Sequence, residues 1–195
     1  EKIRNTAAKY YGNNYYLAGQ GVSTYDLMDT ITDDMVKVNL VAIAAVLIVL
    51  ILTMRQIKTP IVLVLAIETA IWINLSIPYL QNTPLFYIAY LIISSVQLGA
   101  TVDYAILFSD RYRECRREMD KKEGIIATIS QTSVSILTSG ITMIAVGFLL
   151  GIISTHGLLS QLGYLLGKGT ICSVLTVFFV LPGLLYLTDR KKTSF

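Results

Sequence analysis

Residues 98–108 read LGATVDYAILF and place one carboxylate, Asp103, within an apolar stretch long enough to cross a membrane. Moving a carboxylate into hydrocarbon costs about 2.5–3.5 kcal/mol, so acids in such stretches are rare and usually serve as proton relays, ion-pathway residues or counter-ions. Asp103 is therefore the first candidate functional residue of the chain. The alternative is a structural role, in which Asp103 only forms hydrogen bonds to a neighbouring helix.

The rest of the chain has the composition of an integral membrane protein. Of its 195 residues, 54% are hydrophobic and 15% are charged, whereas soluble domains carry about 25% charged residues. Several apolar runs reach the roughly 20 residues that a membrane-spanning helix needs. The five predicted spans are approximately 36–54, 60–78, 85–109, 125–150 and 169–187. The predicted fold is therefore an all-α polytopic membrane protein with five transmembrane helices.

The first 35 residues are more polar and do not continue this pattern. The predicted elements here are a helix over 2–11 ending at Gly12, a strand over 15–18, and a helix over about 26–34 capped by Ser23 or Thr24. A lone strand cannot satisfy its own backbone hydrogen bonds, so this α-β-α segment would have to pair with a sheet outside the chain. A disordered tail is the alternative interpretation.

The predicted organisation has three parts. Residues 1–35 are the end of an extracytoplasmic domain, residues 36–190 form the transmembrane domain, and residues 191–195 are a cytoplasmic tail. Since the chain opens in a polar segment, without methionine and without a signal peptide, we expect it to be part of a longer protein.

The basic residues indicate the orientation in the membrane. The loops expected on one side, residues 79–84 and 151–160, contain no lysine or arginine. The positive-inside rule therefore places the N-terminal segment outside and the C-terminus in the cytoplasm. The cytoplasmic side would receive Arg55, Lys58, Arg111, Arg113, Arg116, Arg117, Lys121, Lys122, Arg190, Lys191 and Lys192.

Several other classes of function have little support. The net charge of +3 arises from residues at the ends of apolar runs and does not indicate nucleic-acid binding. Cys115, in the charged loop predicted over 110–123, and Cys172, within a span, suggest neither a disulfide nor a metal site, and nothing indicates a cofactor. An intramembrane aspartyl protease would need two cooperating aspartates, whereas the spans hold only Asp103 and one glutamate. We therefore do not expect an enzyme.

The neighbours of Asp103 along a helix offer polar partners. Gly99 lies four residues earlier on the same face and would allow another helix to approach the carboxylate. Gln97, Thr101 and Tyr104 form the adjoining face and supply one amide and two hydroxyls. Because burial disfavours the charged form of a carboxyl group, Asp103 could hold a proton at neutral pH and release it when its hydration changes.

Glu68 is the second acid within a span. At 1.5 Å per residue it lies about 12 Å from the cytoplasmic end of its helix, and Asp103 lies about 10 Å from the same side. The two acids could therefore share one polar pocket. A structural role for Glu68 is an equal alternative.

The fourth span carries a row of hydroxyl side chains on one helical face. Such a face predicts either tight helix packing or a hydrated stripe beside the two acids. Its members are Thr128, Thr132, Ser135, Ser139 and Thr142.

The motif around Asp103 resembles the signature of a known family. Residues 99–108, with Arg111-Tyr112-Arg113, closely resemble the MMPL family of bacterial transporters, which belongs to the resistance–nodulation–division (RND) superfamily. The resemblance is most specific at the Asp-Tyr pair and covers essentially all of residues 36–190. It continues through residues 136–140 (ILTSG), Gly147-Phe148, Leu162-Gly163 and Leu181-Pro182.

Members of this family have two similar halves, each with one helix, a large external porter domain and five further helices. The resemblance implies that this chain is the end of one porter domain with its five following helices. Of the two halves, the C-terminal half is the favoured assignment and the first half is the alternative. It implies that Asp103 and Tyr104 form a proton relay with a matching pair of the other half. The whole would be a proton-motive-force-driven exporter of lipids or other hydrophobic molecules in the bacterial cell membrane.

The resemblance also sets the expected partners and an alternative. The partners would be the other half of the transporter, a hydrophobic or lipid substrate and membrane lipids, but no nucleic acid. The second Asp-Tyr pair and most porter sequence are missing here, so the chain alone is not expected to transport. The same five-helix unit is similar to the sterol-sensing domains of Patched and Niemann-Pick type C proteins. The alternative function is therefore a non-transporting lipid- or sterol-sensing membrane module.

Overall fold

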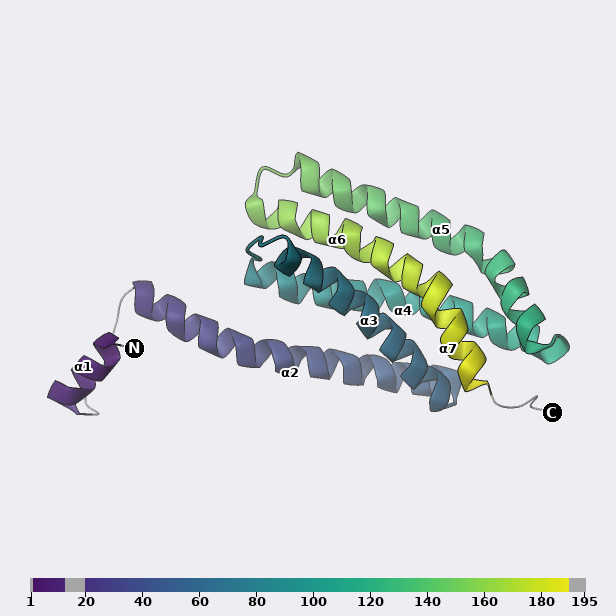
Figure 1. Ribbon diagram of the computed structural model, residues 1–195, viewed down its shortest axis with the longest axis horizontal. Coiled ribbons are helices and arrows are strands. Elements are labelled where there is room, and N and C mark those ends of the chain that lie inside the picture. Colours follow the sequence, from purple (N-terminus) through teal and green to yellow (C-terminus); the bar gives the residue numbers. More distant parts are fainter. Residues whose placement is uncertain (1, 13–19, 190–195) are drawn as a thin grey trace. The chain divides into compact units, whose positions relative to one another are not determined.

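The computed structural model describes residues 2–12 and 20–189, with side chains described for residues 5–10, 12 and 34–189. All regular elements in this part are helical, which confirms the all-α prediction (Figure 1). The strand predicted over 15–18 and the tail 191–195 lie outside the described residues. The elements are α1 (Lys2–Tyr11), α2 (Gln20–Met54), α3 (Lys58–Leu80), α4 (Tyr87–Glu118), α5 (Lys121–Ile153), α6 (Gly157–Leu175), a π-helical turn η1 (Thr176–Val180) and α7 (Leu181–Thr188).

The described residues contain five helical segments long and apolar enough to cross a membrane, as predicted. The last span is longer than expected because it begins at Gly157 and not near residue 169, so that the connection before it is only Ser154–His156. The second span continues through Pro78, where the prediction ended it. The spans are Asp34–Met54, Lys58–Leu80, Tyr87–Glu118, Lys121–Ile153 and Gly157–Thr188.

The chain divides into two compact units, residues 1–38 and 39–195. In the first unit, α1 ends as predicted at Gly12, whose φ of +59° is readily adopted by glycine. The predicted N-caps Ser23 and Thr24 are wrong, because α2 begins at Gln20 and both residues lie within it. Residues 22–54 contain no glycine or proline that would interrupt a helix. The helix predicted over 26–34 and the first span are therefore one continuous element.

Residues 110–118 and 121–123 are helical, so the charged loop predicted over 110–123 is wrong for most of its length. Only Met119 and Asp120 separate α4 from α5. Ion pairs three residues apart, Arg111 with Glu114 and Arg113 with Asp110, stabilise the extension of α4 beyond its apolar part.

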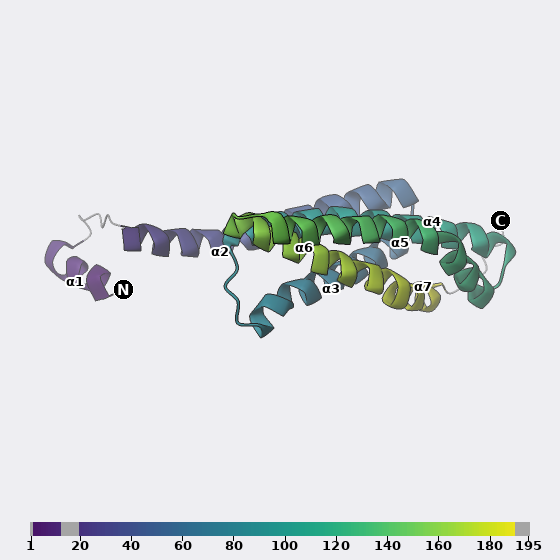
Figure 2. The ribbon, with the colours of Figure 1, turned by 90° about the horizontal axis from the view of Figure 1, so that it is seen from above.

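Helices α5 and α6 lie side by side in both views and contact each other through glycines (Figure 1 and Figure 2). A Cβ atom added to Gly147 of α5 would lie 2.6 Å from the backbone nitrogen of Gly167 in α6. Gly151 and Gly163 form a second contact of the same kind. The glycines thus allow backbone-to-backbone packing, and such close packing is one of the interactions that drive helix association in lipid. This packing also explains why the glycine-rich start of the last span is helical.

The last span bends where α6 gives way to α7 (Figure 1). The backbone N–H of Leu181 donates to the carbonyl of Thr176, a five-residue step that defines the π-helical turn. Pro182 follows and has no N–H to donate, so the regular helical ladder is interrupted at the same place.

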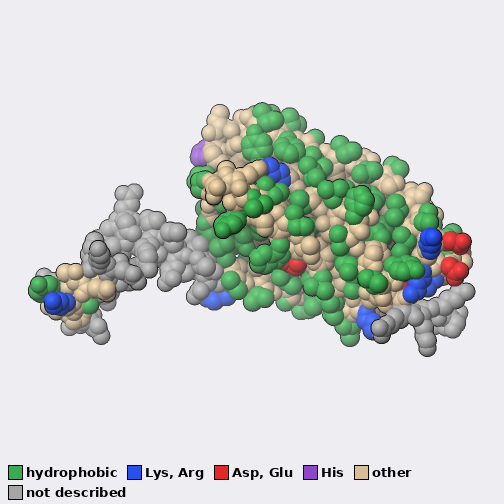
Figure 3. All heavy atoms as spheres, viewed as in Figure 1, with side chains coloured by type: hydrophobic (Ala, Val, Ile, Leu, Met, Phe, Trp, Pro, Cys, Tyr) green, Lys and Arg blue, Asp and Glu red, His purple; other side chains and the backbone are tan. Residues whose placement is uncertain are grey.

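The second unit has an apolar core and an apolar outer surface. Phe108, Leu63 and Ile67 lie in the core between α3 and α4, and Leu50 and Met54 of α2 pack against it. Large apolar side chains also lie outside, such as Trp72, which is 64% exposed. Figure 3 shows hydrophobic side chains over the flank of this unit and a cluster of charged ones at the end of the α4–α5 turn. This distribution suits a helical bundle surrounded by lipid.

Candidate functional site

Asp103 lies on a face of α4 that no other part of the described chain covers. Its side chain is exposed, as are those of Val96 and Leu107 on the same stripe. A Cβ on Gly99, one turn before Asp103, would meet no atom within 4 Å. No hydrogen bond or ion pair reaches Asp103 from the described residues. The expected burial of Asp103 is therefore wrong for this chain, because the neighbouring helices pack against the opposite side of α4.

Tyr104 points in another direction from Asp103 because successive helix residues are about 100° apart. Its side chain is only 7% exposed. The phenol oxygen lies 3.3 Å from Oγ of Ser139 on α5, within hydrogen-bond distance. The structure thus brings together Tyr104 and Ser139, two of the residues selected from the sequence. The acid of the pair faces outward while the phenol is held within the bundle.

Gln97 and Thr101 belong to a buried set of hydrogen bonds that joins α3, α4 and α6. We call Asn74, Gln97, Thr101 and Ser173 the amide–hydroxyl network. The Asn74 Nδ2 donates to Gln97 Oε1 (2.8 Å), and Gln97 Nε2 donates to Ser173 Oγ (3.3 Å). The Oγ atoms of Thr101 and Ser173 are 2.7 Å apart. Backbone carbonyls of α6 complete the set, since Gly169 accepts from Gln97 and Leu165 accepts from Asn74.

Sequence reasoning missed Asn74, Gly169 and Ser173. Asn74 is the only amide within the second span and is completely buried, and this combination is a signal of a buried polar partner. Gly169 and Ser173 are four residues apart on α6, but nothing local to them indicates that they face Gln97.

Glu68 is half-buried on α3. Its Oε1 atom is buried and has no hydrogen-bond partner among the described residues, as also holds for Asn74 Oδ1 and Ser109 Oγ. Trp72, one turn further along α3, interacts with the Glu68 carboxyl group. No hydrogen bond joins Glu68 to Asp103 in the described part of the chain. A pocket shared by the two acids stays a prediction.

The hydroxyl face of α5 is divided between two environments. Thr128 and Thr132 are buried and donate to carbonyls one turn earlier in their own helix (2.7 and 2.8 Å). Ser135, Ser139 and Thr142 are exposed. Helix packing therefore explains the end of this face near the α4–α5 turn, whereas the other end is open apart from the contact with Tyr104.

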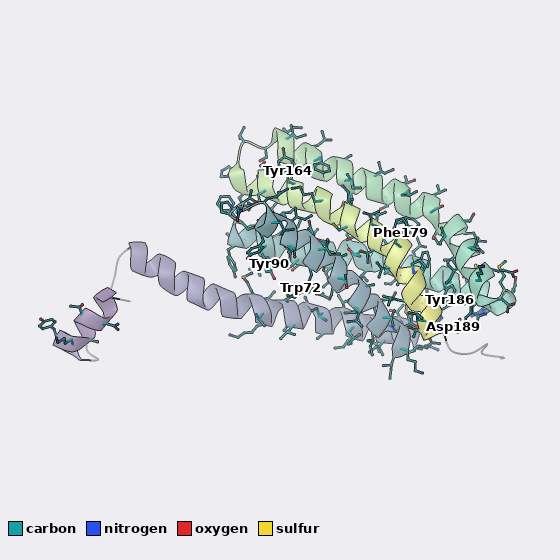
Figure 4. All side chains as sticks on the ribbon, viewed as in Figure 1. Trp72, Tyr90, Tyr164, Phe179, Tyr186 and Asp189 are labelled. Carbon is teal, nitrogen blue, oxygen red and sulfur yellow. The ribbon has the colours of Figure 1, made fainter. Side chains whose placement is uncertain are left out.

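A second polar cluster ties the end of the last span to the α4–α5 turn, and the sequence did not suggest it. The Arg116 guanidinium forms an ion pair with Asp189, and the Tyr112 hydroxyl donates to the same carboxylate (3.0 Å). Lys121 donates to the Asp189 backbone carbonyl. Figure 4 shows Asp189 beside Tyr186 at the end of α7. Burial alone would raise the pKa of Asp189, but the bonds from Arg116 and Tyr112 outweigh it and lower this pKa below its ordinary value.

No group of three or more His, Cys, Asp or Glu side chains that could hold a metal ion occurs among residues 5–10, 12 and 34–189. The site therefore consists of an outward-facing acid and an anchored tyrosine on α4, together with a buried amide–hydroxyl network that joins α4 to α3 and α6. These features define a multi-pass membrane protein with an intramembrane acid–tyrosine pair.

The comparison with protein families identifies this class further. The model of the MMPL family matches residues 1–195, and the chain belongs to this family. It is 29% identical over 193 residues to SCO0839 of Streptomyces coelicolor, which is named as a membrane protein, covering 96% of this chain and 27% of the relative. ActII-3 of the same organism, also named as a membrane protein, is 28% identical over 159 residues, covering 79% of this chain and 22% of the relative.

A third relative is named as a transport protein. MmpL12 of Mycobacterium tuberculosis is 26% identical over 103 residues, which cover 53% of this chain and 9% of the relative. The chain thus spans about a quarter of the length of the Streptomyces proteins and less of MmpL12. Membership of the MMPL family supports a role in membrane transport.

Proposed function

We propose that this chain is one half of a proton-driven exporter of lipids or other hydrophobic molecules, in which Asp103 takes up and releases the proton. The observation that carries the proposal is the position of Asp103 on the open face of α4. A carboxyl group at that position is costly in hydrocarbon unless it titrates or meets a partner. One proton crossing 100 mV releases about 2.3 kcal/mol, which is the energy available per transported proton.

Tyr104 is the proposed companion of Asp103 in the relay. Its hydroxyl is anchored by Ser139, so its backbone position on α4 and that of the neighbouring acid are held against α5. A hydroxyl can both donate and accept a hydrogen bond. It can therefore hold a water chain or a second acid near Asp103 in either protonation state.

The partner proposed for the open face is the other half of the transporter. Gly99 has no neighbour within 4 Å of a Cβ position, so a helix of the other half could approach the backbone beside Asp103 closely. A matching Asp-Tyr pair on that helix would supply the polar group that Asp103 lacks in the described chain. Glu68, with its unpartnered Oε1, is a supporting acid in this proposal.

Transmission to the external part of the protein is proposed to run through α2. This helix is continuous from Gln20 to Met54 and includes the first span. A continuous helix transmits displacement along its axis without a hinge. The N-terminal segment is proposed to lie outside the bacterial cell membrane and the C-terminus in the cytoplasm, with the protein acting as a transporter and not as an enzyme.

The test is the Asp103→Asn variant of the full-length protein, with export measured in membrane vesicles under an imposed proton gradient. Asparagine keeps the size and hydrogen bonding of the side chain but cannot titrate, so export should be abolished while membrane abundance stays near normal. Asp110→Asn is a matched control, because Asp110 is an exposed acid further along α4 whose partner is Arg113 (3.9 Å). Full export by the Asp103→Asn variant would contradict the relay and favour the sensing module.

A further inference from the structure

We propose that Gln97 is a positioning residue that sets the rotation of α4 about its axis and thereby the direction in which Asp103 points. The inference rests on the proposed relay function of Asp103. It gives the amide–hydroxyl network a role, the orientation of α4, that is distinct from the proposed proton transfer by Asp103.

Gln97 is the hub of this network. Its Nε2 donates to the Gly169 carbonyl (3.2 Å) and to Ser173 Oγ (3.3 Å), both on α6, and its Oε1 accepts from Asn74 on α3 (2.8 Å). The NH₂ group and the carbonyl oxygen of this side-chain amide therefore both form hydrogen bonds, and a single residue of α4 is bonded to both α3 and α6. A buried amide with all of its bonds made is rigid, because any displacement leaves a polar group without a partner.

The directions of the hydrogen bonds are determined by the number of available protons. The Thr101 hydroxyl donates to the Gln97 backbone carbonyl (2.7 Å) and so has no further proton to give. Ser173 must then donate to Thr101 across the 2.7 Å contact and accept from Gln97. The Asn74 Nδ2 gives its second proton to the Leu165 carbonyl (3.1 Å). Neither amide can be turned over without losing two bonds, so the network has one arrangement.

The backbone of α6 is shaped to receive this arrangement. A Cβ on Gly169 would lie 2.6 Å from Asn74 Nδ2 and 2.6 Å from Gln97 Oε1. Glycine at this position therefore leaves the space that the two amides occupy. Any larger residue would push Gln97 away from α6.

The network controls Asp103 through the geometry of α4. Gln97 and Tyr104 are seven residues apart and share a helical face, and Tyr104 is tied to Ser139. Two attachments on one face, about 10 Å apart along the axis at 1.5 Å per residue, prevent the helix from turning. Asp103 lies about 100° from Tyr104, so it is directed toward the open face. Loss of the Gln97 attachment would leave α4 held on this side by two weaker polar contacts, Tyr104–Ser139 and Thr101–Ser173.

A second glutamine supplies a control for a purely stabilising role. Gln161 of α6 donates to the Pro84 carbonyl (2.7 Å), and its Oε1 accepts from the backbone N–H of Phe86 (2.7 Å). It therefore also joins α6 to the α3–α4 part of the bundle through one side-chain amide. Its contacts lie in the connection before α4, and none of them is on the face that carries Tyr104.

The experiment compares Gln97→Leu with Gln161→Leu in the full-length protein. The readout is the rate at which a hydrophobic carbodiimide modifies the Asp103 carboxyl group, measured by peptide mass spectrometry so that Asp103 and Glu68 are distinguished. This readout needs no knowledge of the transported substrate. Thermal stability is measured in parallel for both variants.

We expect Gln97→Leu to change the rate of Asp103 modification about fivefold, the equivalent of one net hydrogen bond, and Gln161→Leu to leave it unchanged. Gly169→Ala should act in the same way as Gln97→Leu without removing any polar group, and Ser173→Ala is the milder variant if neither accumulates. Lowered thermal stability with unchanged modification of Asp103 in all network variants would overturn the positioning role. Normal export by Asp103→Asn would instead contradict the relay, and the modification rate would still report the orientation of α4.

Discussion

Replacing Gly147 by alanine should separate α5 from α6 and destabilise the protein. The added Cβ would lie 2.6 Å from the Gly167 nitrogen, 2.9 Å from its Cα and 3.0 Å from the Gly163 carbonyl oxygen, all of them backbone atoms. Ordinary contact begins at 3.4 Å, so the helices must part by about 0.8 Å. A gap of about 0.5–1 Å removes a quarter to a half of the attraction between facing atoms.

The magnitude follows from two opposing effects. Overpacking a tight contact costs about 1–3 kcal/mol, while alanine is favoured over glycine within a helix by about 0.5–1 kcal/mol. The midpoints of these two ranges predict that the free energy of unfolding falls by about 1 kcal/mol. Thermal unfolding of the purified full-length protein in detergent would measure it.

The matched control is Gly183→Ala. A Cβ at Gly183, in α7, would meet no described atom within 4 Å, so this variant gains helix stability without a clash. The reasoning would be refuted if Gly147→Ala unfolded at the same temperature as the wild type and the Gly183→Ala variant.

Three further predictions concern the relay, the Asp189 cluster and the topology. Tyr104→Phe and Ser139→Ala should each weaken proton-dependent export several-fold, and much less than Asp103→Asn does. The double variant should be no worse than either single variant, because both substitutions remove the same contact. Fully additive losses in the export assay would show that the two residues have separate roles. Asp189→Asn should lower thermal stability at neutral pH, and the difference in stability from the wild type should disappear as the pH falls below about 4. The reason is that a carboxyl group with a lowered pKa stabilises the folded state only while it is ionised. A stability difference that stays constant with pH in thermal melts would exclude this cause. Cys115 is buried and unsuited to labelling from solution. The orientation should therefore be tested with Glu118→Cys in a background lacking Cys115 and Cys172, in which an impermeant reagent added outside intact cells should not modify the new cysteine. Modification by that reagent would contradict the predicted topology.

Much of the fold could be predicted from the sequence because span formation is a local property. A run of apolar residues long enough to cross the bilayer satisfies its own backbone as a helix, and the five such runs evident in the sequence agree with the five spans of the described residues. The errors occurred at the ends. Residues 110–118 read as a loop because they are charged, yet ion pairs within α4 continue the helix beyond its apolar part.

The candidate site could be predicted only in part. Asp103 stood out because a carboxylate in an apolar run is costly, and Tyr104 and Ser139 were selected and do meet. Asn74 and Ser173 were missed because neither residue shows its partner in its own segment of the sequence. The burial of Asp103 was predicted from hydropathy, which reports depth in the membrane and not whether another helix covers the side chain.

The sequence by itself determined the number of spans, their composition and the presence of an intramembrane acid beside a tyrosine, since each depends on a short window of residues. Only the tertiary structure decided which side of α4 is packed, that Asp103 faces outward, and that Gln97 joins α3 to α6. The physical reason is that polar groups away from water are satisfied across helices. Asn74 bonds to partners 23 and 91 residues away, and such pairings follow from the packing of whole helices and not from any local pattern.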